Sequence, residues 1–424
     1  MTKHYRIWGV LLFATSCLFL ITAGCGQLAP IPATQKEWTV MFYAAGDNDL
    51  ESYILNNVIQ LQKAGSTSQV NIVAETDWYH HDGTSTTLTT GEGVGRWYIE
   101  KSSSTTSLTS KLVGTLQEIN TGSAASVKDF VLWAVQNYPA KHYMLVMSSH
   151  GGGWKNSPPL KARGLGQDYT SDTTKQLLIT LPDFKTILPD IKSTLGKKID
   201  IIACDACLNG MVEVAYQFKD YADYLVASEE IVPGYGFPWD TIAISLVADP
   251  TRSPRDVTID IVNKYYTSYN QQTNTTIAAI DLSKIDAVAS QFKTFAALFD
   301  TSAKLLAFKN LVNSGTNYDF TIQRYYDATF RDAWDMADKI ITYMSSDASY
   351  NDIVAKCTDL KNAIRDSVIL SRYTSGIPRS YTVYNSYGLA IYIPTPETIA
   401  YDTEYNKLDF TAFTGWGDFL QKLK

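Results

Sequence analysis

The feature that most constrains the fold is the alternation of short apolar segments with helical segments over residues 38–227. Apolar runs rich in strand-forming residues lie at 38–45, 70–75, 95–100, 143–148, 199–203 and 224–227. Segments in which apolar residues have helical spacing lie between them, at 50–63, 127–138, 181–195 and 211–218. Apolar strands that alternate with helices predict an α/β fold, with a mostly parallel sheet covered by helices on both faces.

The pattern changes after residue 250. Helical segments are expected at 256–269, 283–313, 332–346, 350–371 and 410–423. A β-hairpin centred on Tyr387-Gly388 is expected at 382–394. The turn-forming residues Asp249-Pro250-Thr251 suggest a boundary between an α/β domain at 37–250 and a C-terminal helical region with a β-hairpin at 251–424.

The N-terminus has the composition of an export signal. Lys3 and Arg6 precede an apolar run at 7–21, and the small residues Thr22-Ala23-Gly24 follow it. A basic start, a short apolar middle and small residues before a cut are the parts of a secretory signal peptide, here at 1–24. The apolar run is about 15 residues long, shorter than the roughly 20 that a spanning helix needs. A transmembrane anchor stays the alternative.

Cys25, directly after Ala-Gly, resembles the cysteine of a bacterial lipobox, where the signal is removed and the sulfur is acylated. Thr22 departs from the leucine that such motifs usually have at that position. The resemblance implies lipidation of Cys25, a tether at 25–36 and attachment to a membrane. The chain would then be an extracytoplasmic, membrane-anchored bacterial lipoprotein, at the cell surface or in the periplasm.

The exported part of the chain is mildly acidic and poor in cysteine. The formal net charge of the whole chain is −7, and it becomes −9 without Lys3 and Arg6 of the signal region. Because phosphate binding needs a basic face, no nucleic-acid partner is expected. Cys17 and Cys25 belong to the signal region, which leaves Cys204, Cys207 and Cys357. Such a small set in a large exported domain is no disulfide framework. At least one thiol is therefore expected to have another role.

Two polar segments follow expected core strands. Ser148-Ser149-His150-Gly151 follows the strand at 143–148, and Asp205-Ala206-Cys207 follows the strand at 199–203. Loops at the carboxyl ends of parallel strands meet at one edge of a sheet, so His150 and Cys207 would emerge side by side if these strands are neighbours. An imidazole promotes the reactive thiolate. Cys207 is expected to open a helix whose dipole favours the thiolate, and the amides of Gly151 and Cys207 could form an oxyanion hole.

At these residues the chain resembles the clostripain family of cysteine peptidases, which have a caspase-like fold. The matching pieces are His150-Gly151, the segment Asp205–Leu208, and Ala227–Glu230 followed by Pro233–Gly236. Fainter matches lie at 166–168 and 388–392, so the resemblance covers about residues 40 to 395. It implies a cysteine endopeptidase that acts on peptide or protein substrates through a dyad of His150 and Cys207.

The resemblance also carries expectations about specificity. Family members often cut after Arg or Lys, using acidic residues in the substrate pocket, and Asp205 matches the first of these acids. Tyr235 stands where the second acid is expected, which puts strict Arg specificity in doubt. Glu229 is a further candidate for substrate binding, since it could order the cleft.

Activation and cofactors are the last expectations from the resemblance. Some relatives are activated by a cut in the loop after the histidine, where Lys161 and Arg163 form a candidate self-cleavage site. The resemblance implies no definite cofactor, but some relatives use calcium, for which Glu229 and Glu230 are candidate ligands.

Other classes of function stay open. Cys204 and Cys207 form a Cys-x-x-Cys, which is typical of thiol oxidoreductases. A zinc site would need a second pair of ligands, and only Cys357 remains. The main alternative to a peptidase is a non-enzymatic surface protein that binds glycans or proteins through a degenerate peptidase fold.

Overall fold

Apart from Met1, the computed structural model describes residues 35–78, 94–155, 165–171, 179–270, 272–313, 321–374, 376, 382–394 and 403–423. Residues 35–424 group into one compact unit. Apart from Met1, the expected signal peptide lies outside the described residues, and so do Cys25, Lys161 and Arg163. The expected tether at 25–36 overlaps the fold at its end, because Lys36 is the first residue of β1. Within the described part of the chain, no helix has the length and apolar character needed to cross a bilayer.

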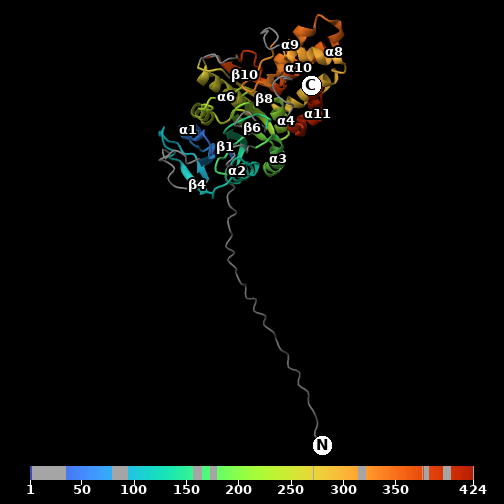
Figure 1. The fold of residues 1–424 in the computed structure, drawn as a ribbon. Coiled ribbons are helices and arrows are strands. Elements are labelled where there is room, and N and C mark those ends of the chain that lie inside the picture. The colour runs from blue at the N-terminus through green and yellow to red at the C-terminus, as the bar shows by residue number, and fades with distance from the viewer. Residues whose placement is uncertain are drawn as a thin grey trace. The chain divides into compact units, whose positions relative to one another are not determined.

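A nine-stranded sheet forms the centre of this unit (Figure 1). Its strands are β1 (Lys36–Gly46), β2 (Val70–Trp78), β3 (Gly95–Tyr98), β4 (Lys111–Thr115), β5 (Ala140–Ser148), β6 (Ile199–Asp205), β7 (Ala222–Ala227), β8 (Thr275–Asp281) and β10 (Val368–Thr374). Their order is β10-β8-β7-β6-β5-β1-β2-β3-β4. The five central strands, β7, β6, β5, β1 and β2, are parallel to one another. β8 and β10 extend the β7 edge and β3 and β4 extend the β2 edge, each through antiparallel pairing. The expectation of a mostly parallel sheet is confirmed.

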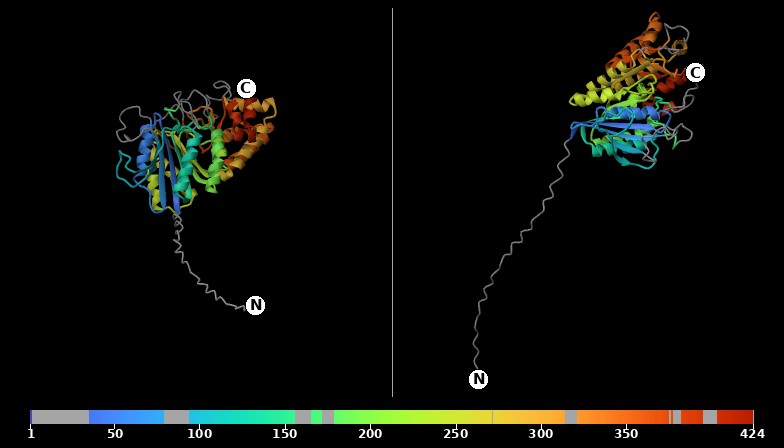
Figure 2. Two further views of the ribbon diagram at one scale, coloured as in Figure 1. Left: turned by 90° about the horizontal axis from the view of Figure 1, so that it is seen from below. Right: turned by 90° about the vertical axis from the view of Figure 1, so that its left-hand side faces the viewer.

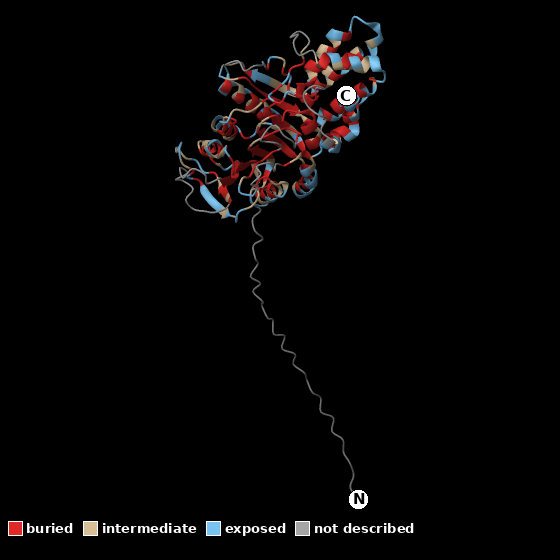
Figure 3. Ribbon diagram, in the orientation of Figure 1, coloured by how far each residue is buried: buried red, intermediate tan, exposed pale blue. Residues whose placement is uncertain are grey.

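Helices cover both faces of the sheet, as expected (Figure 2). One buried cluster joins the sheet to α1 (Glu51–Leu61), α5 (Trp239–Ala248) and α6 (Pro254–Tyr269). The cluster on the other face joins it to α2 (Ala124–Asn137), α3 (Leu181–Leu195), α4 (Val212–Phe218) and α7 (Ile285–Ala297). The central strands are largely buried, except at the first residues of β1, β5 and β7. Exposed residues gather on the outer helices, the edge strand β4 and the loops (Figure 3).

Further helices follow α7 in the sequence. They are α8 (Ser302–Val312), α9 (Ala333–Met344), α10 (Asn351–Ser367), α11 (Asp409–Thr414) and α12 (Trp416–Gln421), with 3₁₀ turns at Ala348–Tyr350 and Thr403–Lys407. A further 3₁₀ turn, Leu282–Lys284, directly precedes α7. Their apolar faces belong to the same buried cluster as α7, which contains Phe308, Ile340, Leu360 and Trp416. The helices after residue 282 therefore extend the layer on one face of the sheet.

Two strands beyond residue 250 belong to the main sheet. β8 pairs antiparallel with β7, and β10 pairs antiparallel with β8. The sequence analysis assigned no strand to 275–281 and extended a helix to residue 371, whereas α10 ends at Ser367 and β10 begins directly after it. The proposed division at residue 250 therefore passes through one continuous sheet.

The expected hairpin at 382–394 contributes a single short strand. β11 (Ala390–Tyr392) pairs antiparallel with β9 (Phe330–Asp332), which lies about 60 residues earlier in the chain. Residues 382–389 form turns and irregular backbone. The segment pairs with other parts of the chain and not with itself. The Ala390 amide donates to the Gly210 carbonyl, 2.7 Å away, and so attaches β11 to the loop before α4.

A buried carboxyl group fixes α4 to the C-terminal segments. Oε1 of Glu213 accepts hydrogen bonds from the Tyr392 amide (2.9 Å) and the Tyr405 hydroxyl (2.7 Å). Burial is the main reason that the pKa of Glu213 rises from 4.5 to about 7. Between these two pH values the folded chain holds a proton that the unfolded chain releases. The contribution of Glu213 to stability is therefore present at low pH and is lost as the pH rises through about 7.

We expect Glu213→Gln to remove this pH dependence, because the amide keeps the Oε1 acceptor and carries no charge. The free energy of unfolding of the variant, minus that of the parent, should rise by on the order of 2 kcal/mol from pH 5 to pH 8. Thermal unfolding midpoints of both proteins at the two pH values check this. A parent-to-variant difference that is the same at both values would contradict the assignment.

Candidate active site

The register of two neighbouring strands places His150 next to Cys207. β5 and β6 are parallel neighbours, and Ser148 lies opposite Asp205 at their carboxyl ends. His150 and Cys207 each follow this pair by two residues. Both line one cavity of about 320 Å³, together with Ser149, Gly151, Leu208 and Val232. The structure thus brings the two side chains to one edge of the sheet, although 57 residues separate them in the sequence.

The backbone of Gly151 packs directly against the backbone of Cys207. A Cβ atom at Gly151 would lie 2.3 Å from the Cys207 carbonyl oxygen and 2.7 Å from the Cys207 nitrogen. Only glycine can occupy this position without a shift of the chain. Within the described residues, neither amide donates a hydrogen bond to a protein oxygen. Both N–H groups are therefore available as hydrogen-bond donors.

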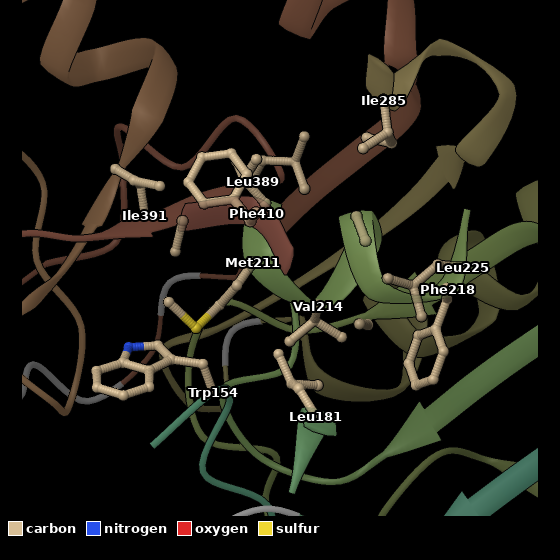
Figure 4. Packing of buried hydrophobic residues seen from close by; sticks show 14 of the residues in the cluster. Trp154, Leu181, Met211, Val214, Phe218, Leu225, Ile285, Leu389, Ile391 and Phe410 are labelled. Carbon is tan, nitrogen blue, oxygen red and sulfur yellow. The ribbon is translucent and has the colours of Figure 1, made fainter. Parts of the chain in front are cut away.

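The residues that follow the two loops anchor them in the core. Trp154 follows the glycines after His150, Met211 lies four residues after Cys207, and both belong to one buried cluster (Figure 4). A Cβ atom at Gly153 would lie 2.5 Å from the Met211 sulfur. This close packing fixes the position of each loop at the edge of the sheet.

Cys207 lies in a turn and not at the start of a helix. α4 begins at Val212, so the expected help from a helix dipole is wrong for this residue. Its thiol donates to the Val232 carbonyl, 3.8 Å away. Burial is the main cause that raises the pKa of Cys207 to about 11. In this state the thiol is protonated, and forming the thiolate requires a base. Leu208, the next residue, has a positive φ of 63°, a strained conformation that is common near functional sites.

His150 is held by an aspartate that the sequence analysis did not select. Its Nε2 lies 2.6 Å from Oδ1 of Asp49, which follows β1, the other neighbour of β5. The hydrogen bond from His150 is the main reason that the pKa of Asp49 falls to about 2. The Tyr169 hydroxyl donates to the same oxygen over 3.2 Å. Among the described contacts, no hydrogen bond joins His150 to Cys207.

Asp205 lines the same cavity and is buried. Its carboxylate accepts hydrogen bonds from the Phe237 amide (3.1 and 3.2 Å) and the Trp239 indole (2.7 Å). Burial raises the pKa of Asp205 to about 6, against the lowering effect of these bonds. Gly236 lines the cavity beside it, and a Cβ atom there would lie 2.7 Å from the carboxylate. Asp205 is thus a charge at the end of an otherwise largely apolar hollow.

Two candidate substrate contacts lie elsewhere. Tyr235 is 66% exposed, and its ring meets Tyr53 edge-on, 5.3 Å between centroids, while its neighbours Gly234 and Gly236 line the cavity. Glu229 is buried, and its Oε2 accepts from the Gly388 amide over 3.0 Å. It does not line the cavity. Burial and the nearby Asp332 raise the pKa of Glu229 well above its usual value, so we correct its role to a structural one.

The other two described cysteines are unsuited to chemistry at this site. Cys204 and Cys357 are fully buried and free. Burial raises the pKa of both thiols far above the ordinary value. Cys204 lies in β6 as an ordinary core residue, which speaks against the oxidoreductase interpretation of Cys204-Asp205-Ala206-Cys207.

A mostly parallel sheet with a thiol and an imidazole that line one cavity at its carboxyl edge is the arrangement expected of a cysteine-type endopeptidase of caspase-like fold. The sequence model of the clostripain family, peptidase C11, matches residues 42–422. The chain therefore belongs to the clostripain family, and the resemblance noted in the sequence is confirmed.

Individual relatives agree with this assignment. The chain is 24% identical to the clostripain of Hathewaya histolytica over 439 residues, which cover 91% of this chain and 80% of that protein. Its fold is similar to an inactive zymogen C11 protease from Parabacteroides distasonis, with a TM-score of 0.64 and 23% identity over 90% of this chain and 99% of that one. A secreted C11 cysteine protease from Bacteroides thetaiotaomicron, in complex with an irreversible peptide inhibitor, gives a TM-score of 0.63 and 21% identity over the same shares.

Proposed function

We propose that Cys207 is the nucleophile of this cysteine endopeptidase and that His150 accepts its proton. The observation that carries the proposal is the shared cavity, which both residues line from equivalent positions beyond the registered pair Ser148 and Asp205. Cys207 is a partly exposed residue that lines the cavity, whereas Cys204 is fully buried.

The proposed reaction begins with transfer of the Cys207 proton to His150. The sulfur then attacks the substrate carbonyl carbon, and the amides of Gly151 and Cys207 stabilise the oxyanion. His150 returns the proton to the leaving amine, and water hydrolyses the thioester. Two contacts must change for the first step. The thiol leaves the Val232 carbonyl, and the imidazole turns from Asp49 towards the sulfur.

We further propose that the cavity accepts Arg or Lys before the cleaved bond. Asp205 supplies one carboxylate for a cationic side chain, while Leu50 and Ile54 line the hollow and suit its methylene groups. The exposed Tyr235 contributes no second charge.

A peptide library that varies the residue before the cut tests activity and specificity together. We expect cleavage after Arg and Lys, and we expect Asp205→Asn to lower kcat/KM for these substrates by about 30-fold or more, because a buried charge pair is lost. Because ionised Asp205 is needed, the preference for basic over uncharged residues should rise with pH through about 6.

Cleavage after aromatic or aliphatic residues that Asp205→Asn leaves unchanged would contradict the proposed pocket. Absence of any cleavage by the parent, combined with binding to glycans or intact proteins, would favour the non-enzymatic alternative.

We propose two covalent events for segments outside the described residues. Self-cleavage at Lys161 or Arg163 would follow from activity towards basic residues, and intact mass after incubation, compared with Cys207→Ser, tests it. Removal of residues 1–24 and lipidation of Cys25 would place the enzyme outside the cytoplasm. The relative from Bacteroides thetaiotaomicron, which is secreted, supports that location. In cells grown with radiolabelled palmitate, we expect the parent protein to become labelled and the Cys25→Ser variant to stay unlabelled.

A further inference from the structure

The carboxylate of Asp205 already has several hydrogen-bond donors in the protein itself. The Phe237 amide lies 3.1 Å from Oδ1 and 3.2 Å from Oδ2. The Trp239 indole donates to Oδ2 over 2.7 Å, and Nδ2 of Asn57 lies 3.4 Å from the same oxygen. Among the described contacts, Oδ1 accepts a hydrogen bond from the Phe237 amide alone. The two oxygens therefore differ, and Oδ1 has the larger remaining capacity to accept a hydrogen bond.

The Phe237 amide competes with the pairing that an arginine prefers. A guanidinium binds a carboxylate best through two parallel N–H···O bonds, one to each oxygen. Here one backbone N–H is shared almost equally between the two oxygens of Asp205. The backbone of Gly236 is also close, since an added Cβ atom would lie 2.7 Å from Oδ2 and 3.0 Å from Oδ1. A two-pronged Arg–Asp205 pair is therefore disfavoured.

Asn57 offers a second acceptor, which carries no charge. It belongs to α1, lines the cavity and is 2% exposed. Its Nδ2 faces the Asp205 carboxylate, because an amide oxygen in that place would be repelled. Its Oδ1 is buried and has no hydrogen-bond partner within the part of the chain that the structure describes. A buried acceptor without a donor is unfavourable, so a donor that binds beside Asp205 would be stabilised there.

The rest of the cavity offers little to a guanidinium. Among the described residues that line it, Asp205 is the only acid. The side chains of Leu50, Ile54 and Ile231 line it as well and accept no hydrogen bond. A guanidinium has five N–H donors in a fixed plane, and donors that are buried without an acceptor cost free energy.

We propose that this enzyme prefers lysine over arginine before the cleaved bond, and that Asn57 determines this preference together with Asp205. The inference rests on the proposed peptidase function and narrows its substrate class. An ammonium group has three N–H donors that rotate about one bond, so it can meet two separate acceptors. One donor binds Oδ1 of Asp205 and another binds Oδ1 of Asn57. The preference therefore comes from acceptors that stand apart, which suit a compact cation better than a planar fork.

The first test compares kcat/KM for two peptides that differ only in Lys or Arg before the cut. We expect the lysine peptide to be cleaved with at least about 5-fold higher kcat/KM, because the arginine leaves buried donors unpaired. Equal or faster cleavage of the arginine peptide would overturn the inference and leave the peptidase function standing.

Binding to Cys207→Ser separates the pocket from the hydrolysis. Titration calorimetry with product-like peptides that end in Lys or Arg should show at least about 5-fold tighter binding of the lysine peptide. The same preference in a protein whose parent cleaves neither peptide would support the pocket and contradict the proposed hydrolysis. Equal affinities, or tighter binding of the arginine peptide, would contradict the preference for lysine.

Variants of Asn57 test its part in the choice. Asn57→Ala should lower kcat/KM for the lysine peptide at least about 5-fold and for the arginine peptide by less, because only the ammonium uses Oδ1. If Asn57 merely oriented Asp205, both values would fall equally. The matched control is Asn56→Ala, which alters the preceding residue of α1, outside the cavity lining, and should keep the parent ratio. An unchanged ratio in folded Asn57→Ala would count against Asn57.

Asn57→Asp gives a second measurement that does not depend on the stability of the alanine variant. The side chain keeps its shape and places a second carboxylate beside Asp205, to which a guanidinium can bind with a separate N–H group. We expect the ratio of kcat/KM for arginine over lysine to rise at least about 5-fold relative to the parent. A ratio equal to that of the parent would contradict the role of Asn57.

Discussion

Cys207→Ser is expected to lower kcat for peptide hydrolysis by at least about 10⁴-fold while the protein stays folded. The hydroxyl is a much weaker nucleophile than a thiolate, and His150 alone cannot activate it to the same degree. Because the side chains have nearly the same shape, the packing against Val232 should persist. Steady-state kinetics, with the circular dichroism spectrum and Tm of both proteins, check the result.

Cys357→Ala is the matched control, since it removes a free thiol that is buried in α10, away from the cavity. At temperatures at which this variant is folded, we expect its kcat to stay within about 2-fold of that of the parent. The lost packing will lower its Tm. If Cys207→Ser kept more than about 1% of the parent activity, the loss would be far smaller than removal of a covalent nucleophile requires. That result would exclude Cys207 from this role.

Gly151→Ala should produce the second largest loss, by about 100-fold or more in kcat. The added Cβ would lie 2.3 Å from the Cys207 carbonyl oxygen and 2.6 Å from the Asn209 side-chain nitrogen, so one of the two loops must move. The amides of Gly151 and Cys207 would then no longer point at the same substrate oxygen. Removing one oxyanion donor costs about 100–1,000-fold in other enzymes. Because only the transition state is affected, KM should change less than kcat.

Gly114→Ala is the control for this substitution. Gly114 lies in β4, and its added Cβ would meet only Arg96, at 3.7 Å, which is ordinary contact distance. We expect unchanged kcat and a Tm equal to or slightly above that of the parent, since alanine restricts the unfolded chain. Equal activity of Gly151→Ala and Gly114→Ala would mean that the backbone amide beside the thiol takes no part in catalysis.

The central part of the fold was predictable because its signals are local. The parallel strands are mostly apolar, as at Tyr143–Met147 and Ile201–Ala203, and the helices between them have their own spacing or cap. Leu181–Leu195 is an example, where Thr180 and Asp183 form a capping box around Pro182 at the first turn, and the expected limits agree with α3. His150 and Cys207 were found because each directly follows such a strand.

The C-terminal half was harder to predict because its strands depend on partners far away in the sequence. β8 is a short run with two alanines and two threonines, and it is a strand only because β7 and β10 lie on either side. β11 contains three residues and relies on β9 and on the Gly210 carbonyl. No local pattern distinguishes such segments from loop or helix.

The residues that support the site depend in the same way on strand order. Asp49 follows β1, and the sequence does not reveal that β1 lies directly beside β5 and hence beside His150. Asn57 is likewise an ordinary helix residue until the fold places α1 beside Asp205. The helix dipole expected at Cys207 was wrong because the turn at 206–210 delays α4 until Val212.

The pairing of one sulfur with one imidazole is tested most directly by a peptidyl chloromethyl ketone with Lys next to the warhead. Intact mass and peptide mapping of the labelled protein identify the modified residue, and the time course gives the rate. The proposed arrangement predicts a single adduct on Cys207, formed at least about 100-fold more slowly in His150→Ala, because the base that generates the thiolate is gone. An adduct on Cys204 or Cys357, or an unchanged rate in His150→Ala, would contradict it.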